Sequence, residues 1–253
     1  MTGKDFMHLL AYDAHRQKKV YKYIDFEGGM SMLGSCNVRF TSAVDLNDEY
    51  DCNAALFNYE TFQKIVTALN LPEEIVKFAI EKDANEISHW GVCSLCKTSD
   101  NVCLWENYAG ENGICIELDV ERTIRALEKL GKKVPLLTVF YYDTVSGLVE
   151  RTLARQKDEL LRYIMIHRLV TSKSKINATT GMNSEAEDEM RLVLFERVES
   201  QEPVYLNLPK DCITNVFFND KMSMANLRNL SSLLRRKYNF SPQRFFFGCC
   251  SST

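Results

Sequence analysis

Short apolar runs bounded by polar, turn-forming residues recur along the chain and predict a series of short strands. Strands that pack on one side of a sheet are expected to be mostly apolar or β-branched over four to eight residues. The segments with this pattern are residues 21–24, 37–42, 92–97, 114–118, 136–142, 190–198 and 211–218.

A second pattern, with apolar residues three or four positions apart, predicts helices between and after these strands. Pro72 begins one over residues 72–83, and Asp119 begins another that Gly131 ends. Residues 146–171 form the longest helical pattern, and its middle is apolar on every side, which is typical of a buried helix. Residues 224–238 predict an amphipathic helix with a leucine stripe.

Strands and helices together predict an α+β fold. No repeat, low-complexity stretch or Pro/Gly-rich linker divides the chain, so we expect one domain over residues 1–253. Its expected core is a mixed or antiparallel sheet with flanking helices and one long buried helix. The polar residues 172–188 predict a loop long enough to take part in function.

Composition and charge narrow the class of protein. With 45% hydrophobic residues, 26% charged residues and a net charge of −3, the chain is an ordinary globular protein without the bulk charge for non-specific nucleic-acid binding. Residues 1–16 contain no uninterrupted apolar segment of signal-peptide kind, and no other stretch is long and apolar enough to predict a membrane partner. Nine cysteines favour reduced thiols and a cytoplasmic location.

One cysteine pair and the glycines have the residue types of known ligand sites. Cys93 and Cys96 have the spacing of half a zinc site, but no second pair follows at the spacing of a zinc finger. In a strand their side chains would also point to opposite faces, so we expect buried thiols and no metal there. The glycine-rich phosphate-binding patterns G-x-G-x-x-G and G-x-x-x-x-G-K-[ST] are both absent from the sequence. This absence removes the main support for a Rossmann or P-loop enzyme.

Two polar clusters lie near predicted strands in the first part of the chain. In one, Tyr21 and Tyr23 share a strand face and Lys22 projects from the other. In the other, hydroxyl side chains at a strand end lead into an acidic turn. The first pattern is equally typical of an edge strand with an exposed lysine, and the second of an ordinary turn formed by Asp and Asn. The candidates in the second cluster are Thr41, Ser42, Asn47, Asp48 and Asp51.

A third cluster lies at the start of the strand predicted over residues 190–198. If that strand already begins at Glu187, then Glu187, Glu189 and Arg191 project from one face and place two carboxylates beside a guanidinium. Paired carboxylates at a strand end can divide catalytic roles, although a solvated acidic loop has the same composition. Trp105 and Tyr108 add an aromatic turn before the strand at residues 114–118.

Taken in order over residues 20–220, these motifs resemble a widespread bacterial family of unknown function. The family has the motifs Y-K-Y, F-S-S-P-x-x-F-N-D-P-x-D, C-L-S, L-M-W-x-x-Y-A, G-x-C-I-x-F-D and E-x-E-x-R. This chain has Ala43 and Glu49 where the family has prolines, and it lacks the tryptophan usually found before E-x-E.

More distantly, an aromatic-basic first strand, a hydroxyl-rich second strand and a late E-x-E strand resemble ADP-ribosyltransferase toxins. The resemblance implies that NAD is the substrate, that Glu189 is the catalytic carboxylate and that Glu187 helps the acceptor attack. It also implies that Tyr21 or Lys22 meets the adenosine or phosphate part of NAD and that residues 172–188 recognise the acceptor. The implied contacts to ribose and nicotinamide are Thr41 and Ser42 for the ribose and Tyr108 for the nicotinamide.

The sequence leaves two other functions open. One is a non-catalytic module that binds a small ligand or a protein, with the acidic residues in structural roles. The other is a hydrolase that holds a divalent ion with Asp48, Asp51 and Glu189. For a transferase, the sequence does not identify the acceptor, which could be a protein, a nucleic acid or water. It also does not distinguish a toxin, an effector and a defence protein. A secreted effector would act in the cytosol of a host cell.

Overall fold

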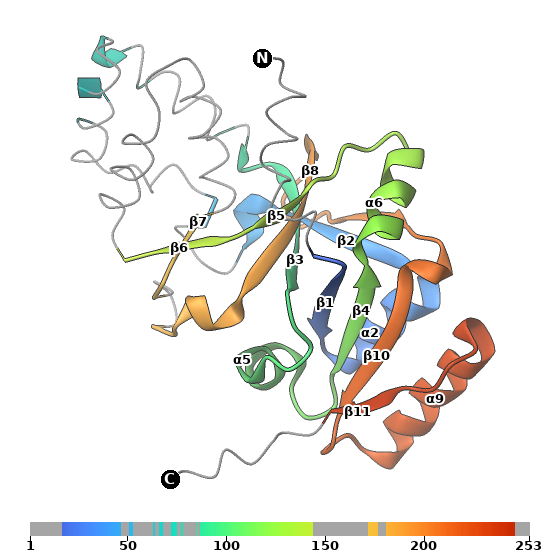
Figure 1. Ribbon diagram of the computed structural model, residues 1–253. Helices are drawn as coiled ribbons and strands as arrows, with labels where there is room; N and C mark the ends of the chain where they lie inside the picture. The colour runs from blue at the N-terminus through green and yellow to red at the C-terminus, as the bar shows by residue number, and fades with distance from the viewer. Residues whose placement is uncertain are drawn as a thin grey trace.

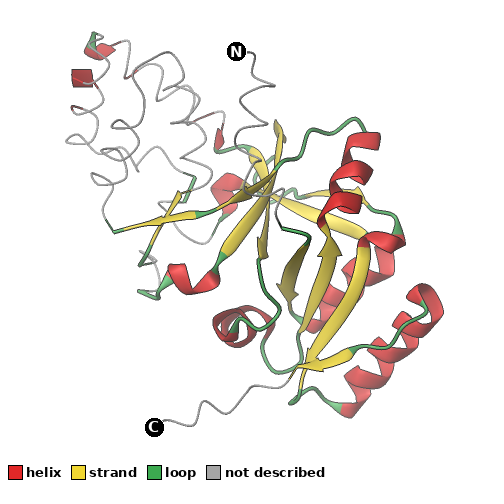
Figure 2. Cartoon of the chain, in the orientation of Figure 1, coloured by secondary structure: helices red, strands yellow, loops and turns green. Residues whose placement is uncertain are grey.

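The computed structural model describes residues 17–46, 51–52, 63, 66–67, 72–74, 77, 85, 87–143, 172–176 and 181–245. In this part of the chain helices pack on a mostly antiparallel sheet, as Figures 1 and 2 show. The predicted α+β class with a mixed or antiparallel sheet is therefore confirmed. The predicted long helix at residues 146–171 and most of the one at residues 72–83 lie outside the described residues.

The described part of the main sheet contains β1 (Lys19–Ile24), β2 (Asn37–Ser42), β3 (Trp90–Cys96), β4 (Ile114–Asp119), β5 (Leu136–Thr138), β8 (Glu189–Arg197), β9 (Val204–Asn207), β10 (Ile213–Asn219) and β11 (Gln243–Phe245). The strand order is β11-β10-β4-β1-β3-β2-β9, and β8 pairs with both β3 and β5. Only the β10–β11 pair is parallel among these described strands. Since β3 contacts β1, β2 and β8, it is the strand at which the sheet branches.

Most predicted strands are confirmed, and β2 has the predicted bounds. The prediction of one buried strand over residues 136–142 is wrong. The amide of Val139 donates to the carbonyl of Glu189 at 3.1 Å, after which the chain leaves β8. It continues as β6 (Phe140–Tyr142), which pairs in parallel with β7 (Ser172–Ser174) in a separate small sheet visible in Figure 1.

The helices in the described part of the chain are α2 (Phe26–Ser35), α5 (Val102–Leu104), α6 (Val120–Lys129) and α9 (Met224–Tyr238), with short turns at η2 (Ala43–Asp45), η4 (Trp105–Ala109), η5 (Ser184–Glu187) and η6 (Lys210–Cys212). Helix α6 begins as predicted, because the Asp119 carboxylate accepts the amide of Arg122 at 3.0 Å. Helix α9 has the predicted bounds, and its Leu230 and Leu234 are fully buried. None of the described helices has the length and hydropathy of a membrane span.

Helix α2 was not predicted, because its three glycines are poor helix formers. Gly29 is needed there for close packing, since a Cβ at this position would lie 2.4 Å from Cδ1 of Ile114. The loop predicted over residues 172–188 also needs correction. The described part of it contains β7 and η5, and an isolated bridge joins Ile176 to Asn183.

The two faces of the sheet carry different cores. The largest apolar cluster lies between the sheet and helices α2, α6 and α9 and includes Leu33, Leu127 and Leu230. On the other face a smaller cluster gathers Tyr23, Trp105 and two buried thiols. Cys93 belongs to the large cluster and Cys96 to the small one, so the two thiols point to opposite faces as predicted.

Candidate functional site

A cavity of about 130 Å³ lies beside the smaller core cluster. Segments far apart in the sequence form its wall: β1, β3, η4, β7, η5 and the first residue of β8. Most of the residues that line it have polar or charged side chains. Six residues proposed from the sequence are among them: Tyr21, Lys22, Asp51, Tyr108, Glu187 and Glu189.

The cavity lies where β1 and β3 separate. In the described sheet these two strands pair at a single position, Tyr21 opposite Cys96. Beyond it, the ammonium of Lys22 donates to the carbonyl of Ser94 at 2.9 Å, in place of backbone pairing. The hydroxyl of Tyr23 donates to the carbonyl of Thr98 at 2.9 Å. Consecutive residues of β1 thus all line the cavity, although strand alternation would send Lys22 to the opposite side from the tyrosines.

Glu189 and Arg191 project from the same face of β8 and form a buried ion pair. Nε of Arg191 donates to Oε1 of Glu189 at 2.7 Å, and Nη2 donates to Oε2 at 3.1 Å. The other edge of the guanidinium donates to Asp51, from Nη1 at 2.7 Å and from Nη2 at 2.5 Å. Arg191 is 1% exposed, Glu189 5% and Asp51 7%. The guanidinium therefore joins two carboxylates that are 138 positions apart in the sequence numbering, Asp51 and Glu189.

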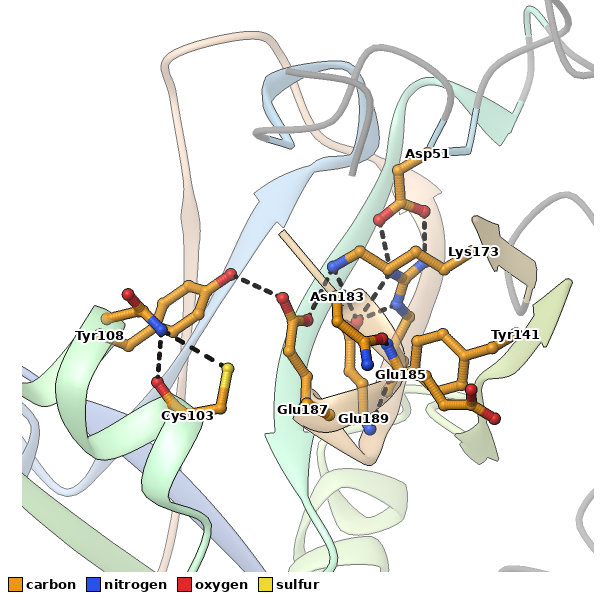
Figure 3. Close-up of polar contacts among 12 residues, drawn as sticks. Asp51, Cys103, Tyr108, Tyr141, Lys173, Asn183, Glu185, Glu187 and Glu189 are labelled. Carbon is orange, nitrogen blue, oxygen red and sulfur yellow. Dashed lines mark hydrogen bonds and ion pairs between the residues drawn. The ribbon is translucent and has the colours of Figure 1, made fainter. Parts of the chain in front are cut away.

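Lys173 joins the two glutamates of the E-x-E segment. Its ammonium lies 2.8 Å from Oε2 of Glu187 and 3.5 Å from Oε2 of Glu189. The hydroxyl of Tyr108 donates to the other oxygen of Glu187 at 3.2 Å. Tyr141 supports the strand start, because its hydroxyl accepts the amide of Glu189 at 3.0 Å. Figure 3 shows Lys173 directed at both glutamates and Tyr108 on the far side of Glu187.

The surroundings shift the pKa values of the two carboxyls in opposite directions. Burial raises the pKa of Glu189, but the charges of Arg191 and Lys173 lower it by more than burial raises it. The pKa therefore lies below its ordinary value. For Glu187 burial is the largest effect and the charge of Glu189 adds to it, so its pKa is raised despite Lys173. Burial and the charge of Glu187 raise the pKa of Tyr108 to about 12, so this phenol stays protonated and can donate.

A turn places Glu187 in the cavity, which corrects the expectation that a strand begins there. Strand β8 begins at Glu189, and Glu187 is the last residue of η5. Between them, Asp188 has a φ of 46°, a left-handed conformation that changes the chain direction. The carboxylate of Asp188 is bound by Lys97 at 2.5 Å, which holds this turn against the end of β3.

The aromatic turn is anchored in the core by one residue and reaches the cavity by another. Trp105 is fully buried, packs edge-on against Tyr23 at 5.4 Å between ring centroids and donates from Nε1 to the carbonyl of Ser99 at 3.0 Å. Tyr108 lies on the same π-helical turn η4, is 45% exposed and lines the cavity. Turns of this kind are frequent at functional sites. Trp105 thus acts as the anchor that holds Tyr108 in place.

Not every candidate from the sequence lies at the cavity. Thr41 and Ser42 pair with the opposite end of β3, and the hydroxyl of Ser42 donates to the carbonyl of Ser88 at 3.2 Å. Neither lines the cavity. Asn47 and Asp48 lie outside the described residues.

Three polar residues at the site were not found from the sequence: Lys173, Tyr141 and Ser94. Lys173 belongs to a polar segment that predicts a loop, and its carboxylate partners are 14 and 16 positions away. The only sequence signal for Lys173 was the excess of carboxylates over cations in the E-x-E segment. Buried carboxylates need a cation as partner, but the pattern does not identify the residue that supplies it.

The described residues include no group of three or more His, Cys, Asp and Glu side chains arranged to hold a metal ion. The carboxylates of Asp51 and Glu189, which the sequence offered as metal ligands, both face the Arg191 guanidinium. Comparison with protein-family models finds no family that matches this chain, and comparison with curated proteins finds no matching relative.

Proposed function

We propose that this protein is an enzyme that cleaves the N-glycosidic bond of NAD and transfers ADP-ribose to a macromolecule, or to water. The observation that carries the proposal is the pair Glu187 and Glu189, two carboxylates beside one cavity with pKa values shifted in opposite directions. Neighbouring carboxyls whose pKa values differ in this way are typical of sites in which one group stays ionised while the other moves a proton.

Glu189 suits the role of the ionised group. Cleavage of the bond between C1′ of the ribose and the nicotinamide nitrogen leaves positive charge on the sugar, and the bonding electrons go to the nitrogen. A fixed carboxylate close to C1′ lowers the free energy of that state. Glu189 is held by Arg191, and its lowered pKa keeps it ionised at neutral pH.

Glu187 suits the role of the proton acceptor. The attacking hydroxyl, amine or water forms the new bond to C1′ and gives up one proton, which balances the reaction when Glu187 takes it. A carboxyl with a raised pKa is a better base for this step than one with an ordinary value. Lys173 and Tyr108 hold one oxygen each of Glu187, so its carboxylate is oriented before substrate binds.

The size of the cavity limits what enters it. At about 130 Å³ it is smaller than the roughly 300–1,000 Å³ of pockets that enclose a whole ligand. We therefore assign it to the nicotinamide and its ribose, with the half-exposed ring of Tyr108 as a stacking surface. Tyr21 and Lys22 are the remaining candidates for contacts to the phosphate side. Thr41 and Ser42 are left out of this proposal because they do not line the cavity.

One observation favours a non-catalytic binding module as the second candidate. Both oxygens of Glu189 are bound by Arg191, and the side chain is 5% exposed. A carboxylate so fully bonded can serve structure alone. In that case replacing it changes stability or affinity and no turnover is observed.

Nicotinamide release from NAD by the purified protein tests the proposal, with chelator present and absent. Glu189→Gln keeps the shape of the side chain, and Arg191 keeps Asp51 as its partner, so the variant should fold. We expect release to fall by about a hundredfold or more. The matched control is Glu185→Gln on η5, an exposed glutamate of the same segment whose loss should leave release unchanged.

The other outcomes assign the other functions. Binding of NAD or of another ligand without any release in the folded protein would favour the binding module. Hydrolytic activity that the chelator abolishes would favour the metal-dependent hydrolase, because glycosidic cleavage of NAD needs no metal. Glu187→Gln separates transfer from bond cleavage, since it should reduce ADP-ribosylation of the acceptor more than it reduces nicotinamide release.

A further inference from the structure

The guanidinium of Arg191 holds the candidate catalytic carboxylate from one side and is itself held from the other. Two of its nitrogens donate to the two oxygens of Glu189, and two donate to the two oxygens of Asp51. Two-point contacts between a planar guanidinium and a carboxylate fix angle as well as distance. The orientation of Glu189 is therefore set by a group that does not line the cavity.

Stability alone is a weak reason for such an arrangement. Buried ion pairs lose much of their attraction to the cost of removing charges from water, and apolar side chains of similar volume often serve stability equally well. The apolar side chains Met190, Leu192 and Leu194 alternate with Glu189 and Arg191 along β8. Over residues 189–194 the charged side chains of β8 are thus confined to the face on which Glu189 meets the cavity, which points to a role there.

We propose that Arg191, clamped by Asp51, is the positioning residue that fixes the orientation and the ionised state of the Glu189 carboxylate. This inference rests on the proposed function, in which Glu189 must stay ionised close to C1′ of the ribose. Asp51, which itself lines the cavity, acts on Glu189 through Arg191 by holding the far edge of the guanidinium.

The other groups around Glu189 do not replace Arg191. Lys173 is the second cation, but it lies closer to Glu187, at 2.8 Å against 3.5 Å. The remaining neighbours are neutral donors, thiols or further acids. The charged and titratable groups that face Glu189 are Arg191 on β8, Asp51 and Cys52, Lys173 on β7, Glu187 on η5, Tyr141 on β6, Tyr108 on η4, and Cys93 on β3.

Three variants separate geometry from charge. Arg191→Lys keeps the positive charge and loses the two-point contact, so kcat for nicotinamide release should fall by about tenfold to a hundredfold while KM for NAD changes little. Asp51→Asn leaves Arg191 paired with Glu189, so the fold should be retained while kcat falls. Arg191→Gln removes the charge, so the acid limb of the pH profile, at which Glu189 is protonated, should move to higher pH.

A second readout does not depend on turnover. Carbon-detected NMR of the side-chain carboxyls follows the titration of Glu189, assigned by the signal that Glu189→Gln removes. We expect its midpoint to rise in Arg191→Gln. It should not rise in Arg191→Lys or Asp51→Asn, because a cation stays beside it. The control is Arg197→Gln on the same strand, which breaks an exposed pair with Glu199.

The outcomes distinguish this inference from the proposed function. If the wild type releases no nicotinamide but the midpoints shift as expected, the inference about Arg191 is supported and the proposed function is wrong. If the wild type is active and folded Asp51→Asn and Arg191→Lys keep the wild-type kcat, the clamp does not position Glu189 and the inference is overturned. A Glu189 midpoint that stays unchanged in Arg191→Gln would also overturn it.

Discussion

Replacing Lys173 by methionine removes the cation that Glu187 and Glu189 share. Glu189 keeps Arg191, but Glu187 keeps only the hydrogen bond from Tyr108. The side chains of Lys173 and Glu187 are 8% and 13% exposed, so the lost ion pair is poorly screened by water. Removing one partner of a buried pair costs about 3–5 kcal/mol when the other stays charged.

Protonation of Glu187 limits this cost and makes it depend on pH. Adding a proton to a carboxyl with an unfolded-state pKa of about 4.3 costs about 1.4 kcal/mol per pH unit above that value, which gives a limit of about 4 kcal/mol at pH 7 and about 1 kcal/mol at pH 5. The folded-state pKa of Glu187 is already raised in the wild type, and without Lys173 it rises further. Both proteins lose stability from Glu187 as the pH rises above about 4.3, and the variant continues to lose it up to a higher folded-state pKa. The difference from wild type therefore grows between the wild-type and the variant pKa of Glu187.

Urea unfolding followed by circular dichroism at pH 5, 6, 7 and 8 measures this difference. The matched control is Lys175→Met, two positions away, where the lost partners are Asp143 at 3.1 Å and Glu185 at 3.7 Å. Lys175 is much more exposed, so its replacement should have an effect that is small and nearly independent of pH. If Lys173→Met lowers the free energy of unfolding equally at pH 5 and pH 8, the reasoning is refuted. The cost would then come from lost packing of the lysine's aliphatic stem and not from the lost ion pair.

Three further substitutions test the surroundings of the site. Tyr108→Phe removes a hydrogen bond that favours the charged form of Glu187, so NMR titration should show the pKa of Glu187 moving upward while the fold is retained. In Gly113→Ala the new Cβ would lie 2.0 Å from the backbone oxygen of Ala109, so the thermal midpoint should fall by more than about 4 °C, as calorimetry would show. Asp119→Ala removes the N-cap of α6 and should lower the free energy of unfolding by about 1 kcal/mol in urea titrations.

Elements with a clear local pattern were predictable from the sequence. Strand β2 and helix α9 have the predicted bounds, and Asp119 caps α6 as expected, because alternation, a leucine stripe and a capping residue act over a few neighbouring positions. Alternation along β8 likewise places Glu189 and Arg191 on one face without knowledge of the rest of the fold.

Helix α2 and the division between β5 and β6 were not predictable in this way. Gly29 disfavours a helix locally, and its value appears only when Ile114 packs against it. Val139 continues the apolar run of residues 136–142, but β8 begins at Glu189, and the amide of Val139 already donates to the carbonyl of that residue, so the chain leaves β8 there. In both cases a partner far away in the sequence overrides the local preference.

The sequence by itself offered most of the acidic, aromatic and basic side chains of the candidate site, because their chemical type is read directly from the residue, although it did not single out Lys173. Tertiary structure alone decided which of them meet. Asp51 reaches Arg191 across 140 positions, Lys173 arrives from a separate small sheet, and the turn at Asp188 directs Glu187 to the cavity. Thr41 and Ser42 lie on the predicted strand but at the wrong end of β3 for the cavity. Charge pairing in a buried site depends on strand order and on turns in the folded chain, and a pattern with a period of two or 3.6 residues contains neither.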